Sequence, residues 1–395
     1  MILIILFELA KEVTSMTIFK KNLQNMKKTW EALNNLLNRK TKKSRHVNAV
    51  KDFNNGNKIN RNPQRIANIL NEHFASVGEK LASKIPAPGD HRDFLKKTKS
   101  PASSFMFKPV TAREVELEIL PLPNNKSHGL YSCPTKLLKY SSTIISYILA
   151  KIVNLSVTSG SYPSKLKKAK VIPVFKTEDE TDANNYRPIS LLSIFDRIFE
   201  KVMYKRMMHF INVKNILFSA QYGFREGFST EHAIIDIVSA IQSNMDKRLF
   251  TCGIFIHLKK AFDTVNYQIL LNKLNHYGFR GIINNWFESF LCNRSQTLEI
   301  NKQLSDAAPI SNSVPQGSVL GPLLFLSYIN DIHTSSNTFN FYFFADDTNI
   351  LYVNKNLRSL EATVNSALKK LYLWLVSNKL TLNTKKNNFV IFHPY

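Results

Sequence analysis

The stretch "FYFFADDTNILY", residues 341–352, places two adjacent carboxylates, Asp346 and Asp347, between runs of aromatic and aliphatic residues. The apolar runs predict two strands, and the polar residues between them predict the turn of a hairpin. Asp is common in turns, so a plain turn is one interpretation. A metal site is the other, because hard divalent cations such as Mg²⁺ bind carboxylate oxygens.

The charge of the chain narrows the choice of partner. Among 395 residues there are 53 Lys or Arg and 29 Asp or Glu, which gives a formal net charge of +24. An excess of this size favours a polyanion, most commonly nucleic acid, with a membrane surface as the rival. The three cysteines are too few and too scattered for a disulfide framework or a zinc site, and this usage indicates a reducing compartment.

Residues 1–109 are predicted to form a basic N-terminal extension and linker. Residues 17–45 hold nine Lys or Arg and one acid, with apolar residues at near-helical spacing, which predicts a basic amphipathic helix. Both direct RNA contact and packing on a neighbour remain open for it. Residues 46–63 and 86–107 are typical of connecting chain. The opening "MILIILFELA" is too short for a membrane span and lacks the flank of a signal peptide, so we expect neither.

From residue 110 the pattern is mixed α/β. The strand predicted at 169–175 contains Pro173, which favours a sheet edge or a bulge. Residues 184–193 are predicted to be a loop that leads into a helix. Helices are predicted within 63–85, 112–123, 133–163 (broken near its middle), 194–211, 267–278, 282–293, 313–332 and 359–380, and strands within 251–258 and 388–392 as well as in the hairpin.

Paired acids on a hairpin suit the kind of site in which two metal ions clamp the attacking and leaving oxygens of a displacement. Such a site needs a further carboxylate from a neighbouring strand. The natural supplier is the strand predicted at 251–258. His257 stands at the position where that acid is expected.

Four segments, "YRPISLLS", "AFDTVN", "SVPQGSVLGPLLF" and "FFADDTNI", follow one another in this order. Together they resemble the reverse transcriptase domain of non-LTR (LINE) retrotransposons, most of all the jockey-like branch, over about residues 165–395. The resemblance implies an α/β (α+β) right-hand polymerase fold within 110–395, with fingers largely in 110–250. It also implies an antiparallel palm sheet that carries the paired acids, preceded by the helical basic extension. The expected product is a fragment that stops before the thumb.

By this resemblance the domain is an RNA-directed DNA polymerase, a nucleotidyltransferase of a mobile element. Its partners would be an RNA template, a DNA primer and dNTPs. Its cofactor would be Mg²⁺ in a two-metal site held by Asp346 and Asp347. Nuclear location follows because such elements use chromosomal DNA as primer. A membrane partner is not expected, since the charge is spread along the chain and neither end carries a lipidation motif.

The resemblance also carries roles to other residues. Phe262 corresponds to the bulky residue beneath the incoming sugar, and Gln316 and Gly317 to the loop that approaches the template and nucleotide. Gly317 lacks a Cβ, which suits close approach of the backbone. Taken alone, Phe262 is more often a core residue and the loop an ordinary turn.

Three cations complete the set of expected site residues. Arg187 and Lys176 resemble the finger residues that hold the triphosphate, and a planar guanidinium can bind phosphate oxygens bidentately. Lys386 resembles the lysine proposed as general acid for the pyrophosphate leaving group, and its neighbour Lys385 is the alternative. Taken alone, Arg187 is more often part of a surface ion pair.

The chain departs from the family at His257, where the family pattern has an aspartate. A neutral imidazole offers one lone pair and no negative charge, and it suits softer metals than Mg²⁺. Asp263 lies past the strand end, and we do not expect it to substitute. The sequence therefore predicts an impaired or inactive polymerase. The alternative is a non-catalytic RNA- or DNA-binding protein derived from a dead reverse transcriptase.

Overall fold

A computed structural model describes residues 53–55, 58–86, 89–124, 129–130, 133–176 and 179–393. The chain divides into two compact units, Met1–Ala49 and Val50–Tyr395, and every described residue belongs to the second. The basic helix predicted within 17–45 lies outside the described residues. The domain boundary expected after residue 109 stays a prediction.

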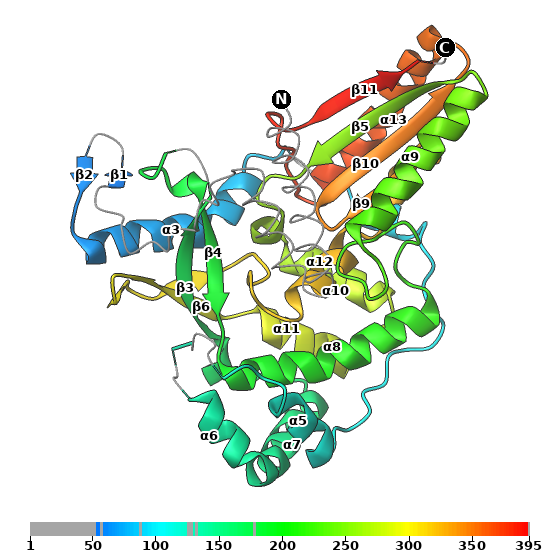
Figure 1. Ribbon diagram of the computed structural model, residues 1–395. Helices are drawn as coiled ribbons and strands as arrows, with labels where there is room; N and C mark the ends of the chain where they lie inside the picture. The colour runs from blue at the N-terminus through cyan, green and yellow to red at the C-terminus, as the bar shows by residue number, and fades with distance from the viewer. Residues whose placement is uncertain are drawn as a thin grey trace, which may run out of the picture. The chain divides into compact units, whose positions relative to one another are not determined.

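The hairpin belongs to a four-stranded sheet of order β11-β5-β10-β9. All its neighbouring strands run antiparallel, as predicted for the sheet that carries the paired acids. The long helices α9 and α13 pack against this sheet (Figure 1). Its elements are β5 (Phe250–His257), β9 (Asn340–Phe344), β10 (Asp347–Asn354), β11 (Asn388–Phe392), α9 (Thr230–Asp246) and α13 (Leu357–Ser377). The strand of 251–258, the helix of 359–380 and the last strand are confirmed; α9 was not predicted.

The second sheet has the order β4-β3-β6-β7, with β8 also paired to β6. Its strands are β3 (Lys168–Phe175), β4 (Tyr186–Leu191), β6 (Arg294–Ile300), β7 (Gln303–Leu304) and β8 (Ala308–Ile310). Strand β3 is interior, but its parallel pairing with β6 stops at Val171, so Pro173 meets only β4 and its missing N–H is tolerated.

The prediction of a loop at 184–193 was wrong, because β4 occupies most of it. Pro188 lies opposite Pro173 on an edge strand that pairs with β3 alone. A proline can occupy such a position because no second neighbour needs its N–H.

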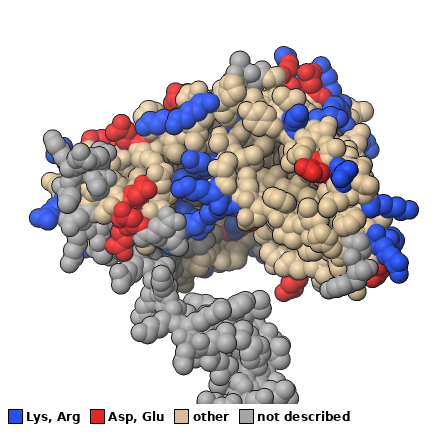
Figure 2. All heavy atoms as spheres, turned by 90° about the horizontal axis from the view of Figure 1, so that it is seen from above, with Lys and Arg blue, Asp and Glu red and all other residues tan. Residues whose placement is uncertain are grey.

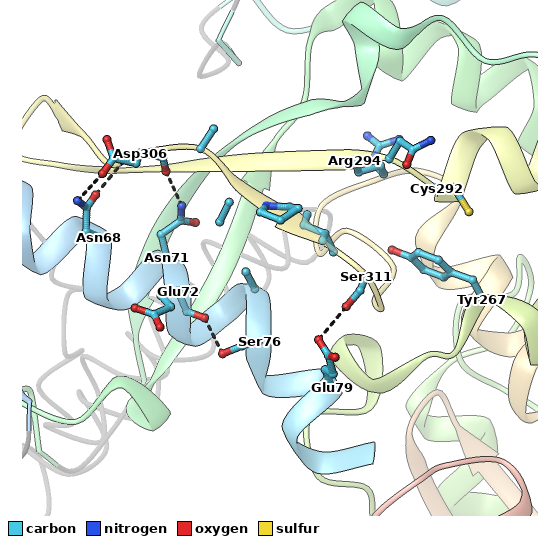
Figure 3. Close-up of a pocket in the computed structure, with 16 residues that line it drawn as sticks. Asn68, Asn71, Glu72, Ser76, Glu79, Tyr267, Cys292, Arg294, Asp306 and Ser311 are labelled. Atoms are coloured by element: carbon cyan, nitrogen blue, oxygen red, sulfur yellow. Dashed lines mark hydrogen bonds between the residues drawn. The ribbon is translucent and has the colours of Figure 1, made fainter. Parts of the chain in front are cut away.

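Helix α3 (Pro63–Ala82) packs across β6 and β8. The Asn71 amide donates to the Asp306 carbonyl at 2.8 Å, and Asn68 bonds to the Asp306 side chain at 2.8 Å (Figure 3). A cavity of about 770 Å³ lies between the helix and these strands. Gly78 faces the backbone of Asp263, whose carbonyl oxygen would lie 2.0 Å from an added Cβ, so only glycine permits this approach.

The remaining helices form the main hydrophobic core with the four-stranded sheet. The break predicted within 133–163 is confirmed at Ser141, between α6 and α7. The other predicted helices are confirmed as well. The elements are α5 (Ala112–Ile119), α6 (Thr135–Tyr140), α7 (Ser142–Thr158), α8 (Ile194–Lys214), α10 (Tyr267–His276), α11 (Ile282–Leu291) and α12 (Gly321–Ile329). Shorter pieces are β1 (Phe53–Asn55), β2 (Lys58–Asn60), α4 (Arg92–Leu95), η1 (Ser164–Lys167), η2 (Ala183–Asn185), η3 (Ala261–Thr264) and η4 (Ile332–Ser335).

The outer edge of β9 is covered by the loop before α9. Tyr222 donates its N–H to the Phe343 carbonyl at 2.8 Å. The Gln221 side-chain oxygen accepts the N–H groups of Gly223 at 2.9 Å and of Ala345 at 3.1 Å. A Cβ on Gly223 would lie 2.3 Å from the Ala345 nitrogen. The loop therefore holds the hairpin turn only if residue 223 is glycine.

Gly223→Ala is expected to lower the free energy of unfolding by about 2–3 kcal/mol, because the added methyl overlaps the hairpin backbone. Gly227→Ala is the matched control: its Cβ meets no atom within 4 Å, so only its φ of +80° is strained. That strain costs about 1 kcal/mol. Urea denaturation measures both changes. Amide exchange at Ala345 should accelerate in Gly223→Ala alone, and equal behaviour of the two variants would contradict the contact.

Candidate active site

The paired acids lie at the tip of the hairpin, in a tight two-residue turn. Ala345 and Asp346 form the turn, and Ala345 takes a φ of +56°. Asp347 is the first residue of β10. Opposite Asp347, across the β10–β5 pairing, stands His257. Directly opposed residues of antiparallel strands project to the same face, so the imidazole and the carboxylate are neighbours.

His257 is held at the end of β5 by backbone bonds to the segment before β11. Its N–H donates to the Asn387 side-chain oxygen at 3.0 Å, and its carbonyl accepts from the Asn383 N–H at 2.9 Å. The imidazole Nδ1 is buried without a hydrogen-bond partner. The ring thus occupies the expected acid position, with one nitrogen unused.

Lys386 reaches the site on a bulge beside β5. Leu382 pairs with Leu258, whereas pairing in β11 resumes with Asn388 opposite Phe255. Residues 383–387 therefore loop out, with the Lys386 N–H donating to the Asn383 carbonyl at 2.9 Å. This bulge sets Lys386 near Asp347.

The electrostatics of Asp347 reflect these neighbours. Burial and the adjacent Asp346 carboxylate raise the pKa of Asp347, while His257 and Lys386 act in the opposite direction. Two like charges side by side make ionisation costly, and a cation nearby relieves part of that cost. The structure brings together four predicted residues here: His257, Asp346, Asp347 and Lys386.

Three further cations gather around Lys386, two of them from the second sheet. Lys176 follows β3, and its N–H donates to the Asn185 carbonyl at 2.9 Å. The neighbouring Lys386 ammonium lowers the pKa of Lys176, and partial burial and the charges of Arg187 and Lys260 lower it further. Lys176, Arg187, Lys260 and Lys386 are called the cation group below.

Lys260 was not predicted from the sequence. It lies two residues before Phe262 in "KKAFD", so its place beside an expected site residue was the available signal. Its ammonium approaches the carbonyl oxygens of Asn184 at 3.4 Å and Tyr186 at 3.5 Å. Burial lowers its pKa, and the charge of Asp263 opposes that shift. Figure 2 shows Lys and Arg side chains gathered beside a hollow on the face seen from above.

Phe262 lies in η3 and is half-buried. Its ring stacks on Phe325 with centroids 4.5 Å apart, and its edge meets Phe224 at 6.3 Å. Phe224 directly follows Gly223, which packs on the hairpin turn. Phe262 is therefore linked to the tip of the hairpin through this loop, while part of its ring serves the core.

The loop of Gln316 and Gly317 docks on β4. The Gln316 carbonyl accepts the Ser190 N–H at 2.7 Å, and its side-chain amide donates to Asp263 at 3.0 Å. Gly317 has a φ of +113°, and a Cβ there would lie 2.7 Å from the Ser190 carbonyl oxygen. Glycine is required at 317 on both counts.

Asp263 does not join the paired acids. One of its carboxylate oxygens accepts from Gln316, and the other is buried without a partner. Burial raises its pKa to about 6, although Lys260 and the Gln316 bond lower it. Asp263 thus serves the loop and does not replace the acid that was expected at 257.

The donor set does not suit a pair of Mg²⁺ ions. Within the described part of the chain, no three His, Cys, Asp or Glu side chains lie close enough to hold a metal ion together. Asp346 and Asp347 are carboxylates, but the third position offers an imidazole nitrogen, which Mg²⁺ binds poorly.

The ordered motifs, the antiparallel sheet and the paired acids on its hairpin define a polymerase-type nucleotidyltransferase domain. The chain belongs to the reverse transcriptase (RNA-dependent DNA polymerase) family, whose model matches residues 167–392. The predicted resemblance to jockey-like non-LTR retrotransposons is confirmed by the relatives found.

Three relatives from Drosophila melanogaster show the extent of this similarity. The RNA-directed DNA polymerase from mobile element jockey is 27% identical over 297 residues, which cover 73% of this chain and 32% of the relative. The probable RNA-directed DNA polymerase from transposon BS is 25% identical over 84% of this chain and 37% of the relative. The probable RNA-directed DNA polymerase from transposon X-element is 25% identical over 72% of this chain and 32% of the relative. The matches span about a third of each relative's length.

None of the helices in the described residues combines the length and the apolar composition needed to cross a bilayer.

Asp263 makes the stability of the domain depend on pH. A carboxyl whose pKa rises from 3.8 to about 6 on folding binds its proton more tightly in the folded state, so stability falls as pH rises through this range. Asp263→Asn keeps an acceptor for Gln316 and removes this titration. Relative to wild type, the variant should gain about 2 kcal/mol of unfolding free energy between pH 4.5 and pH 7. A constant difference across this range would contradict the assignment.

Proposed function

We propose that this chain is an RNA-directed DNA polymerase by descent whose chemistry is impaired at His257. In this proposal the sheet β11-β5-β10-β9 is the palm, and β3, β4 and the helices before them belong to the fingers within 110–395. Residues 1–109 are the basic extension. The partners are an RNA template, a DNA primer and dNTPs, and the expected place of action is the nucleus.

The cation group would bind the triphosphate of the incoming nucleotide. Its members come from β3, β4, the β5–η3 connection and the bulge before β11, so the charges converge from separate elements. Phe262 would lie beneath the sugar, and its stacking on Phe325 gives the ring a fixed position. The loop of Gln316 and Gly317 would contact template and nucleotide through backbone groups.

The observation that carries the impairment is the cross-strand pair of His257 and Asp347. An acid at 257 would add a carboxylate beside Asp347 and Asp346 and raise the negative charge that attracts divalent cations. An imidazole adds none, and in its protonated form it would repel the metal. Asp346 and Asp347 remain the residues that would hold Mg²⁺, with too few oxygen ligands for a pair of ions.

The second candidate function is non-catalytic binding of RNA or DNA. It is favoured by the net charge of +24 and by the cation group, in which Lys386, Arg187 and Lys260 crowd Lys176. Phosphate neutralisation releases counterions, so such binding requires no metal and weakens with salt.

Primer extension on an RNA template with dNTPs and Mg²⁺ distinguishes the impaired polymerase from the non-catalytic binding protein. Wild type, His257→Asp, and His257→Asp combined with Asp346→Ala should be compared. Only His257→Asp is expected to extend the primer efficiently, at a rate about 100-fold or more above that of wild type. Loss of one main electrostatic group in an active site lowers rates by about this factor. Wild-type extension equal to that of His257→Asp would overturn the impairment.

Nucleic-acid binding gives an independent prediction. Lys176→Gln combined with Arg187→Gln should weaken binding of a primer–template with bound dNTP. The slope of log K against log[salt] should become shallower by about two, because two phosphate contacts are lost. Lys136→Gln with Lys139→Gln, on the distant helix α6, is the charge-matched control. Fluorescence anisotropy without Mg²⁺ measures both. Equal losses of affinity in the two double variants would show that the cation group binds nucleic acid no more strongly than other surface lysines do.

A further inference from the structure

Glu200, in the middle of α8, is a carboxylic acid with no exposed surface. Acids are almost never fully buried unless their oxygens are bonded. One oxygen of Glu200 accepts the N–H of Leu320 at 3.2 Å and also that of Val319. The other oxygen is buried without a partner. The side chain thus reaches out of its own helix to bond the backbone of another segment.

That segment is the junction between the Gln316–Gly317 loop and α12. The first backbone N–H groups of a helix lack intrahelical acceptors. Leu320, the N-cap of α12, offers no side-chain acceptor of its own. Ser318 satisfies Gly321 at 2.7 Å, and Glu200 satisfies the two amides between them. Glu200 therefore acts as a cap supplied from α8.

Capping fixes the loop at its second end. Its first end is already fixed, since Gln316 bonds to Ser190 on β4 and to Asp263 on η3. Without Glu200, residues 319 and 320 would leave buried N–H groups unpaired, and the chain would move to find other acceptors. The loop would then lose the position from which Gly317 touches β4.

Glu200 is in turn embedded in a buried polar network. Asp196 lies one turn earlier on α8, accepts a hydrogen bond from the Tyr162 hydroxyl, and lies 3.5 Å from the Arg294 guanidinium. Burial and the charge of Asp196 raise the pKa of Glu200 to about 8, while Arg294 and the two backbone bonds lower it. Arg294 is the one cation among these four side chains, so they constrain one another.

We propose that Glu200 is a positioning residue that holds the Gln316–Gly317 loop in the conformation that receives template and nucleotide. This rests on the proposed function of that loop. Glu200 itself touches no substrate in this proposal. It acts through Val319 and Leu320, and its effect should appear in nucleotide use more than in overall nucleic-acid affinity.

The experiment uses the full chain carrying His257→Asp, so that extension can be measured. Glu200→Gln keeps an acceptor oxygen, Glu200→Leu removes it, and Ile198→Ala, a buried substitution on the same helix, controls for lost stability. Three readouts are needed, and the first two are amide exchange at Val319 and Leu320 and the KM for dNTP measured together with kcat. The anisotropy of the RNA–DNA complex reports binding.

Glu200→Leu should accelerate exchange at Val319 and Leu320 about tenfold or more, as expected when the acceptor of two buried N–H groups is lost, and raise the KM for dNTP several-fold. The affinity for the RNA–DNA duplex should stay unchanged in Glu200→Leu. Glu200→Gln should keep amide exchange and the KM for dNTP close to those of the parent chain. Ile198→Ala should change neither quantity. A folded Glu200→Leu with unaltered exchange would overturn the proposal, as would a Glu200→Gln no better than Glu200→Leu. If the parent His257→Asp chain fails to extend, the proposed function fails, while exchange still tests the capping.

Discussion

The pairing of β10 with β5 determines which side chains can work together in this domain. Its register sets Asp347 opposite His257, and β11 pairs with the other edge of β5. Because a slip of one residue would turn the side chains of a strand to the opposite face, the hydrophobic residues of β5 fix the site as firmly as they fix the core. The acids, the imidazole and the Lys386 bulge all derive their places from that one strand.

The charges around this strand are unequal. Lys386 lies beside Asp347, and together with Arg187 and Lys260 it lowers the pKa of Lys176. Such an arrangement is costly when empty and favourable around a phosphate anion. A carboxylate at 257 would balance part of it. With histidine there, the electrostatics favour holding phosphate over holding divalent cations, so one physical cause would account for both the proposed impairment and the proposed nucleic-acid binding.

Much of this could be predicted from the sequence, for reasons that particular residues make clear. The hairpin, β5 and the long helices α3, α8 and α13 have strong local patterns, and they were predicted, whereas α9 was not. Strand β4 was missed because Pro188 is a poor local signal, tolerated only because the strand lies at an edge. Lys260 and Glu200 were missed because their partners are distant in sequence: Lys260 approaches the carbonyl of Tyr186, and Glu200 bonds to Val319. Nothing local marks such contacts.

Counting the metal ions bound at the hairpin tests the proposed effect of His257 without requiring catalysis. Electron paramagnetic resonance of Mn²⁺, titrated into wild type and His257→Asp with primer–template and a non-reactive dNTP analogue, gives the number of ions held. Asp346→Ala in each background subtracts ions bound elsewhere. The account predicts a pair of Asp346-dependent ions in His257→Asp and at most a single, weaker one in wild type. An equal pair in wild type would contradict it.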